Sequence, residues 1–437
     1  MSDDLAGALA AALGGAVGDL QRLSGGASRE TWGLTLDDTP LILQRERPGG
    51  IRTGGGMAAE AGLIRAAAAE GVPVADVVAT GSGDDDGLGA PWIVARRVEG
   101  ETIARRILRE DTYAEARTLL AGQCGAALAA IHRVDPDSVT GLHEMEQVSQ
   151  FRDLIDALGQ PHPAFELGLL WLEANRPPPS GRAVVHGDFR NGNLIVGPEG
   201  LRAVLDWELA HLGDPMEDLG WLCVRAWRFG GDGPVGGFGT REDLYGAYEA
   251  AGGRPVDPAV ARWWEVLGTL KWGVMCIIQA ATHLTGQSRS VELAAIGRRV
   301  CEQEYDLLAL IDPAGGVPNP TMGVAEPSLH DVPTAGQLLE AVREWVEGDA
   351  REATTGRVQF HTRVVANVLA MLERELESGP AMAEAHTFRL AALGVSSEAD
   401  LAARIRSGEW SVDDRALLDT VRATVVDKLA VANPKYL

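Results

Sequence analysis

The chain has 437 residues, 46% of them hydrophobic and 23% charged, which predicts a globular protein of two or three domains. Its formal net charge of −23 argues against nucleic acid and anionic membranes as partners, because both require clustered Lys and Arg on the protein. The four cysteines form neither a disulfide framework nor a zinc signature, and the chain opens on acidic residues. We therefore expect a cytoplasmic protein without a secretory signal or a membrane span.

The N-terminal part of the chain has the pattern of a small nucleotide-binding lobe. Residues 57–70 are rich in helix formers and end at Gly71, which favours a helix. Runs rich in strand formers flank this helix and predict short strands at residues 31–36, 41–45, 74–80 and 91–98. A few strands around one helix, followed by a short linker at 99–101, form this pattern.

The rest of the chain is predominantly helical. A Pro- and Gly-rich segment at 312–335 interrupts it, and amphipathic helices are expected beyond, at 335–376 and 380–432. These patterns predict an N-lobe at 1–98, a helical lobe with the catalytic loop at 99–315, a linker at 316–334 and a helical accessory domain at 335–437.

The strongest chemical signal is the segment 184–208, VVHGDFRNGNLIVGPEGLRAVLDWE. Asp188 follows an apolar strand end, Asn193 lies five positions later, and a hairpin returns Asp206 beside Asn193. Phosphoryl transfer needs such a set, because one carboxylate orients the attacking hydroxyl while hard oxygen ligands hold magnesium. The spacing HxDxxxxN, followed by an Asp after an apolar strand, is that of a kinase catalytic loop. A chance polar turn is the disfavoured alternative.

The segments HGDFRNGN and LDWELAHLGDPMEDLGW resemble the aminoglycoside phosphotransferase and choline-kinase-like superfamily. The resemblance is closer to phosphotransferases that occur alone in bacteria or fused to acyl-CoA dehydrogenases, and it covers about residues 20–310. It implies an α+β, protein-kinase-like bilobal fold that uses ATP and Mg2+, with Asp188 as catalytic base and Asn193 and Asp206 as magnesium ligands. Arg190 is placed to offset charge on the transferred phosphoryl group.

Three polar residues near this loop are expected to support it rather than to react. His186 would stiffen the loop, and Asp218 would hydrogen-bond it from behind. Asp214, with Pro215 after it, predicts the N-cap of a helix. His132, after an apolar run, is expected to pack in the core.

The candidate nucleotide-binding residues are Gly25, Gly26, Ser28, Arg45, Glu60 and Ala95. The first three form a glycine-containing loop that could approach phosphates, and Ala95 lies in the strand whose backbone would hold the adenine. Kinases pair a strand cation with a helix glutamate, here Glu60. The position at which kinases carry this cation is occupied here by Gln44, and Arg45 follows it. Because side chains alternate along a strand, these two side chains point to opposite faces of the sheet. Which of the two contacts the nucleotide stays open.

Three functions stay open on this basis. The leading one is a kinase for a small-molecule hydroxyl, with a hydroxyacyl-CoA as substrate and an acyl-CoA dehydrogenase as partner, both implied by the resemblance. The second is aminoglycoside modification, although the helical substrate region contains no dense carboxylate cluster. The third is a non-catalytic nucleotide-binding scaffold, against which the intact set of Asp188, Asn193 and Asp206 argues.

A protein kinase is the least favoured function, because only eleven residues separate Asp206 from Asp218, too few for an activation segment. The C-terminal helices resemble a domain that accompanies these phosphotransferases, and they contain no nucleophile–base pair. We expect an accessory role for them. The oligomeric state stays open.

Overall fold

A computed structural model describes residues 2–23, 29–46, 56–84, 86–323 and 333–437. The chain divides into two compact units, one of Met1–Met145 with Pro177–Glu265 and the other of Glu146–Arg176 with Val266–Leu437. The boundaries expected from the sequence do not coincide with this division, because the expected helical lobe at 99–315 contributes to both units.

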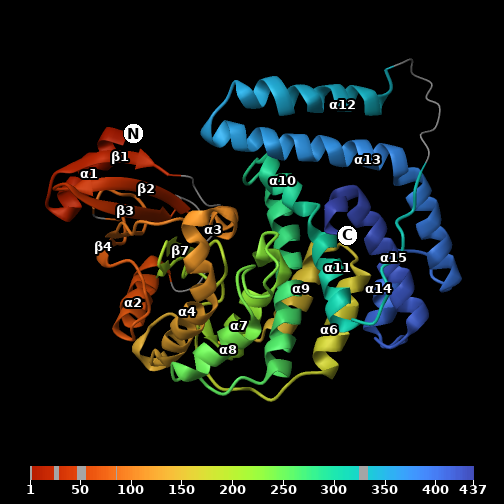
Figure 1. Cartoon of the computed structure of the whole chain (residues 1–437), viewed down its shortest axis with the longest axis horizontal. Coiled ribbons are helices and arrows are strands. Elements are labelled where there is room, and N and C mark those ends of the chain that lie inside the picture. Colours follow the sequence, from red (N-terminus) through yellow and green to blue (C-terminus); the bar gives the residue numbers. More distant parts are fainter. Residues whose placement is uncertain (1, 24–28, 47–55, 85, 324–332) are drawn as a thin grey trace. The chain divides into compact units, whose positions relative to one another are not determined.

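The first unit contains a five-stranded antiparallel sheet with the order β1-β2-β3-β5-β4 (Figure 1). Its elements are α1 (Ser2–Leu13), β1 (Val17–Arg22), β2 (Arg29–Leu36), β3 (Thr39–Glu46), α2 (Gly56–Ala69), β4 (Val77–Gly81) and β5 (Trp92–Arg96). The four strands and the helix expected here all form, each within a few residues of its expected bounds. Helix α1 and strand β1 are not among the elements predicted from the sequence.

Helices α1 and α2 cover opposite faces of this sheet. Leu5 and Leu9 of α1 pack in one cluster with Leu43 of β3. Met57 of α2 packs in another cluster with Ile93 of β5. Because side chains alternate along a strand, each strand therefore sends alternate residues toward α1 and toward α2.

The remainder of the first unit carries the motif-bearing segment on two short antiparallel pairs, β6 with β9 and β7 with β8. The hairpin expected after Asn193 forms, with Leu194 opposite Val204. The elements are α3 (Ala104–Arg109), α4 (Ala114–Arg133), β6 (Ala183–Val185), β7 (Leu194–Gly197), β8 (Gly200–Val204), β9 (His211–Gly213), α7 (Met216–Cys223), α8 (Arg241–Ala250) and the beginning of α9 (Pro258–Leu284).

The described residues of the second unit are helical and contain no strand. Besides the end of α9, this unit has α5 (Gln147–Leu158), α6 (Pro163–Ala174), α10 (Val291–Gly297), α11 (Val300–Ile311), α12 (Ala335–Trp345), α13 (Gly356–Ala392), α14 (Glu398–Arg406) and α15 (Arg415–Ala432). One core joins Leu167 of α6 and Leu308 of α11 to Leu390, Val425 and Leu429 of the C-terminal helices. The expected all-helical C-terminal region is thus confirmed.

Helix α13 continues through Pro380, where the sequence predicts a break. Proline removes one backbone donor and strains the preceding turn, which usually ends or kinks a helix. Here contacts to α15 on both sides of Pro380 hold the helix: Arg374 donates to the carbonyl oxygen of Val431, and Arg389 pairs with Asp427 at 2.6 Å.

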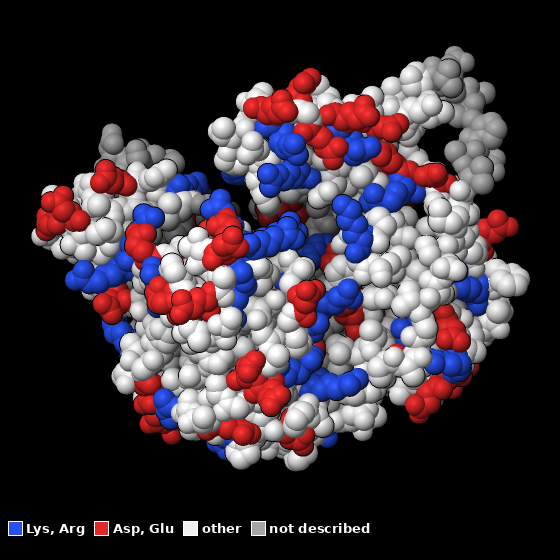
Figure 2. Space-filling view, viewed as in Figure 1, with Lys and Arg blue, Asp and Glu red and all other residues white. Residues whose placement is uncertain are grey.

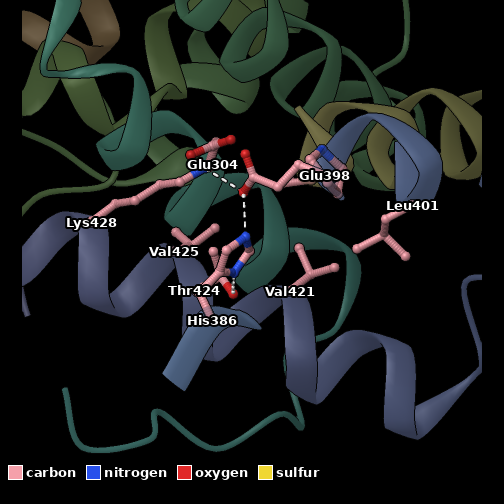
Figure 3. Close-up of a pocket in the computed structure, with 10 residues that line it drawn as sticks. Glu304, His386, Glu398, Leu401, Val421, Thr424, Val425 and Lys428 are labelled. Carbon is pink, nitrogen blue, oxygen red and sulfur yellow. Dashed lines mark hydrogen bonds and ion pairs between the residues drawn. The ribbon is translucent and has the colours of Figure 1, made fainter. Parts of the chain in front are cut away.

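Charged residues line a small pocket in the second unit (Figure 3). Lys428 of α15 donates to Glu398 of α14 at 2.9 Å, and Glu304 of α11 pairs with His162 at 2.9 Å. Burial disfavours the ionised form of Glu304, but Lys428 and His162 outweigh it and lower the pKa of Glu304 to about 2. This carboxylate is therefore ionised inside the helical core at neutral pH.

No helix in the described part of the chain is long and apolar enough to cross a membrane. On the face drawn in Figure 2, acidic and basic side chains are interspersed.

Candidate active site

The loop between β6 and β7 is fixed by His186 and Gly187. Gly187 has a φ of +77°, and a Cβ added to it would lie 2.4 Å from the carbonyl oxygen of Leu209. His186 is fully buried, and its Nδ1 accepts the Asp188 amide at 3.2 Å while Nε2 donates to the carbonyl oxygen of Leu205 at 3.1 Å. Burial lowers the pKa of His186, so the neutral ring ties the loop to the end of β8. This is the stiffening role expected from the sequence.

Both carboxylate oxygens of Asp188 are held by donors. Oδ1 accepts from Arg190 Nε and from Trp221 Nε1, each at 3.0 Å, and Oδ2 accepts from Asn193 Nδ2 at 2.6 Å. Asp188 is 8% exposed. Because the amide nitrogen of Asn193 is engaged by Asp188, its amide oxygen is the part left to meet a cation. The structure thus brings together Asp188, Arg190 and Asn193.

Asp206 lies beside this group, two residues after β8. The amide of Leu205 donates to the carbonyl oxygen of Asn193 at 2.8 Å, which fixes the approach of the two segments. Asp206 has a φ of +66°, a left-handed conformation that non-glycine residues seldom adopt. Burial, with the nearby carboxylates of Glu208 and Asp188, raises the pKa of Asp206 to about 7. Such a crowded set of acids is stabilised by a bound cation.

The donor set fits magnesium better than a metal held by protein ligands alone. Within the described ranges, no three His, Cys, Asp or Glu side chains are grouped so as to hold a metal. Mg2+ is usually bound through one or two carboxylates, with water and substrate phosphates completing its octahedron. The carboxylate of Asp206 and the amide oxygen of Asn193 could be the ligands that the protein supplies to Mg2+.

Asp218 supports the loop from behind, as the sequence predicts. Its carboxylate accepts the amides of His186 at 2.8 Å and Gly187 at 3.0 Å. Burial opposes its ionisation, but hydrogen bonding to His132 and the charge of that ring keep the pKa of Asp218 below its usual value. His132 lies 3.1 Å from Asp218 and 2.9 Å from the hydroxyl of Tyr248, so it orients this support in addition to packing.

Asp214 caps the start of α7 from one position further upstream than a standard N-cap. Helix α7 begins at Met216 with Pro215 in the cap position. The carboxylate of Asp214 accepts the amides of Met216 at 2.9 Å and Ser180 at 2.6 Å. It therefore also fixes the loop that precedes β6.

Two tryptophans complete the surroundings of Asp188, and neither is among the site residues predicted from the sequence. Trp221 follows Asp218 by one helical turn on α7, a spacing that places both side chains on the same face. Trp227 lies under Arg190, with the guanidinium carbon 4.6 Å from the ring centre. The signal that could have identified Trp221 is this three-residue spacing.

In the smaller lobe, Arg45 and Glu60 have different partners. Arg45 bonds Glu30 at 2.6 Å and the carbonyl oxygen of Leu88 at 3.0 Å. Glu60 instead receives two hydrogen bonds from Arg29, at 2.9 and 2.6 Å. The physical reason is strand alternation, which places Arg45 on the α1 face of the sheet while Glu60 belongs to α2.

The remaining nucleotide candidates stay predictions. Gly25, Gly26 and Ser28 lie outside the described residues. Ala95 lies inside the sheet, opposite Ile42 of β3 and Val77 of β4.

Comparisons with known proteins agree with this architecture. The model of the phosphotransferase enzyme family matches residues 19–264, more than half of the chain. A second model, described only as a domain of unknown function (DUF6285), matches residues 352–436. A solved structure from Ralstonia eutropha assigned as an aminoglycoside phosphotransferase superposes with a TM-score of 0.56 at 21% identity, covering 70% of this chain and 96% of that one.

Curated relatives are named acyl-CoA dehydrogenases. Acyl-CoA dehydrogenase family member 10 of Mus musculus is 29% identical over 47% of this chain and 20% of its own length. Acyl-CoA dehydrogenase family member 11 of Gallus gallus is 34% identical over 31% of this chain and 18% of its own length. The chain thus spans about a fifth of these relatives. Because the family model covers the strands of the sheet, the Asp188 loop and Asp206, the chain belongs to the phosphotransferase enzyme family.

Proposed function

We propose that this protein transfers the γ-phosphate of ATP, with Mg2+, to a hydroxyl group of a hydroxyacyl-CoA. The observation that carries the proposal is the fixed carboxylate of Asp188, held by Arg190, Trp221 and Asn193 at 2.6 to 3.0 Å. Bound Mg2+ would neutralise charge on the phosphates, and Asn193 and Asp206 would hold it.

Asp188 would orient the acceptor hydroxyl and accept its proton. The hydroxyl oxygen forms a bond to the γ-phosphorus, the bond from that phosphorus to the β–γ bridging oxygen breaks, and ADP leaves with the electron pair. Arg190 lies 3.0 Å from Asp188, close enough to offset charge on the transferred group. Positioning and charge stabilisation are the principal contributions that a protein makes to this reaction.

The choice of acceptor rests on the relatives. Two of them are named acyl-CoA dehydrogenase family members, and this chain matches only a fifth of their length. A kinase region within such a chain suits a substrate that carries coenzyme A. Phosphorylation would convert the hydroxyl into a good leaving group, and an acyl-CoA dehydrogenase is the proposed partner.

The decisive experiment measures ADP release with Mg-ATP across hydroxyacyl-CoAs, free hydroxy acids and aminoglycosides. Asp188→Asn is the matched variant, because it keeps the shape of the side chain but removes its charge. We expect acceptor-dependent ADP from the hydroxyacyl-CoAs and a fall in kcat of at least about 100-fold in the variant. Turnover of aminoglycosides alone would replace the proposed substrate with an antibiotic, and ATP binding without turnover of any acceptor would favour a scaffold.

A further inference from the structure

Gln44 is an uncharged residue at a position where a kinase carries a cation. It lies opposite Ile93 in the register between β3 and β5. Ile93 packs against Met57 and Ala61 of α2, and paired residues of neighbouring strands point to the same face. Gln44 therefore lies on the α2 face, where kinases place a positive charge to hold the nucleotide phosphates, but it brings no charge.

Arg29 occupies the same face of the sheet, on the neighbouring strand. It lies opposite Glu46, and Glu46 follows Gln44 by two residues, so strand alternation places all three on the α2 face. Arg45, by contrast, lies opposite Glu30 and is paired with it on the other face. Of the two arginines, Arg29 is the one that faces α2.

The contacts of Arg29 are those of a positioned guanidinium. Two of its nitrogens form a fork with both oxygens of Glu60, and its Nε lies 3.3 Å from Glu208. Its side chain is 13% exposed, and that of Glu60 is 6% exposed. Burial opposes its charge, but Glu60, Glu208 and Asp206 outweigh this and raise the pKa of Arg29. Arg29 thus connects the helix glutamate to the segment that carries Asp206.

The guanidinium retains capacity for an anion. A guanidinium has five N–H groups, and contacts to the described residues use three of them. A pocket lies beside it, lined by Arg29, Glu60, Leu63, Leu142, Trp207 and Glu208 among others. Planar guanidinium groups bind phosphate oxygens in pairs, with a geometry that a lysine does not offer.

We propose that Arg29, held by Glu60, supplies the nucleotide-binding cation that Gln44 does not provide, and that it binds phosphate oxygens of the nucleotide. In the usual kinase arrangement this cation lies on the strand that corresponds to β3. Here the cation is Arg29 on β2, and its partner is still a glutamate of the helix, Glu60 of α2. This inference rests on the proposed function, since it assigns a residue to the same nucleotide site.

The test compares Arg29→Met with Arg45→Met, in which the same side chain is removed from the other face of the sheet. The measurement is the Kd of a fluorescent ATP analogue with Mg2+, with thermal unfolding as the check on folding. We expect Arg29→Met to weaken binding at least about tenfold and Arg45→Met to change it less than about twofold. Arg29→Lys keeps the charge and should bind more tightly than Arg29→Met.

A rescue variant provides a second readout. In Arg29→Met with Gln44→Lys, a cation returns to the α2 face, and we expect much of the lost affinity to return. Unchanged binding in Arg29→Met, or equal losses in both methionine variants, would overturn the role of Arg29 while leaving the kinase function standing. If the unaltered protein binds no nucleotide, the proposed function itself is wrong and the inference falls with it.

Discussion

Asp188 is surrounded by donors that come from separate parts of the chain. Arg190 and Asn193 belong to its own loop, whereas Trp221 reaches it from α7. A carboxylate fixed on both oxygens cannot rotate away from an incoming hydroxyl, and such fixed geometry is what proximity catalysis requires. The hydrogen bond from Trp221 is thus a positioning contact for the proposed reaction.

We predict that Trp221→Phe lowers kcat about tenfold and leaves the KM for ATP within about twofold, because one hydrogen bond to a charged oxygen is lost. Steady-state kinetics with the preferred acceptor measure both constants. Trp227→Phe is the matched control, since a phenyl ring still lies under Arg190. Equal losses in both variants would show that packing, rather than the indole N–H, is what matters.

Gly187 gives a second prediction at this scale. Its φ of +77° is costly for any residue with a Cβ, and that Cβ would meet Leu209 at 2.4 Å. We expect Gly187→Ala to destabilise the protein by at least about 1–2 kcal/mol and to reduce turnover sharply, as measured by urea denaturation and ADP release. Gly62→Ala is the control: its Cβ meets nothing within 4 Å in α2, so it should leave stability equal or higher.

At the scale of elements, the C-terminal helices are joined by charges as well as by apolar packing. Glu304 on α11 is buried, with His162 beside it. Lys428 on α15 stabilises its charge (Figure 3). Its folded pKa of about 2 lies below the ordinary value of 4.5. The ionised pair therefore contributes stability above about pH 4.5, and this contribution is lost as the pH falls toward 2.

We predict that Glu304→Gln lowers the free energy of unfolding at pH 7 by about 3 kcal/mol, because the variant loses the buried carboxylate whose ionised form the folded chain favours. The difference from the unaltered protein should narrow as the pH falls from 4.5 toward 2. Urea denaturation at several pH values tests this. Glu375→Gln breaks an exposed pair with Arg298 and should cost less than about 1 kcal/mol. A loss for Glu304→Gln that is independent of pH would contradict the assignment.

At the scale of the whole molecule, the C-terminal region shares a core with helices α6 and α11, which precede it in the chain. Leu417, Val425 and Leu429 of α15 are buried in one cluster with Leu167 of α6 and Leu308 of α11. Burying each such side chain contributes roughly 1.5–3 kcal/mol. The region is thus part of the fold of the second unit.

We expect a chain truncated after residue 332 to lose this core and to be unstable, with a melting temperature at least about 10 °C lower or with aggregation on expression. Thermal unfolding of the truncated and full-length chains measures the effect. Adding residues 333–437 as a separate polypeptide should restore part of the stability. A truncated chain as stable as the full-length protein would show that the C-terminal region is an independent appendage.

The sequence alone determined the parts of this protein whose partners lie close together in the chain. His186, Asp188, Asn193 and Asp206 are contained in one strand, loop and hairpin, so spacing and alternation sufficed to bring them together. The strands of the smaller lobe and the helical character of the rest follow from local pattern for the same reason.

Tertiary structure alone decided the contacts between distant residues. Arg29 meets Glu60 across 31 residues, Trp221 meets Asp188 across 33, and His132 meets Asp218 across 86. Local spacing carries no information on such pairs. The contact between Arg29 and Glu60 depends on which face of the sheet α2 covers, and the contact between Trp221 and Asp188 depends on which turn of α7 lies against the Asp188 loop. Both arrangements follow from the packing of apolar surfaces. The sequence therefore predicted the candidate reacting residues, and packing selected the side chains that hold them in place.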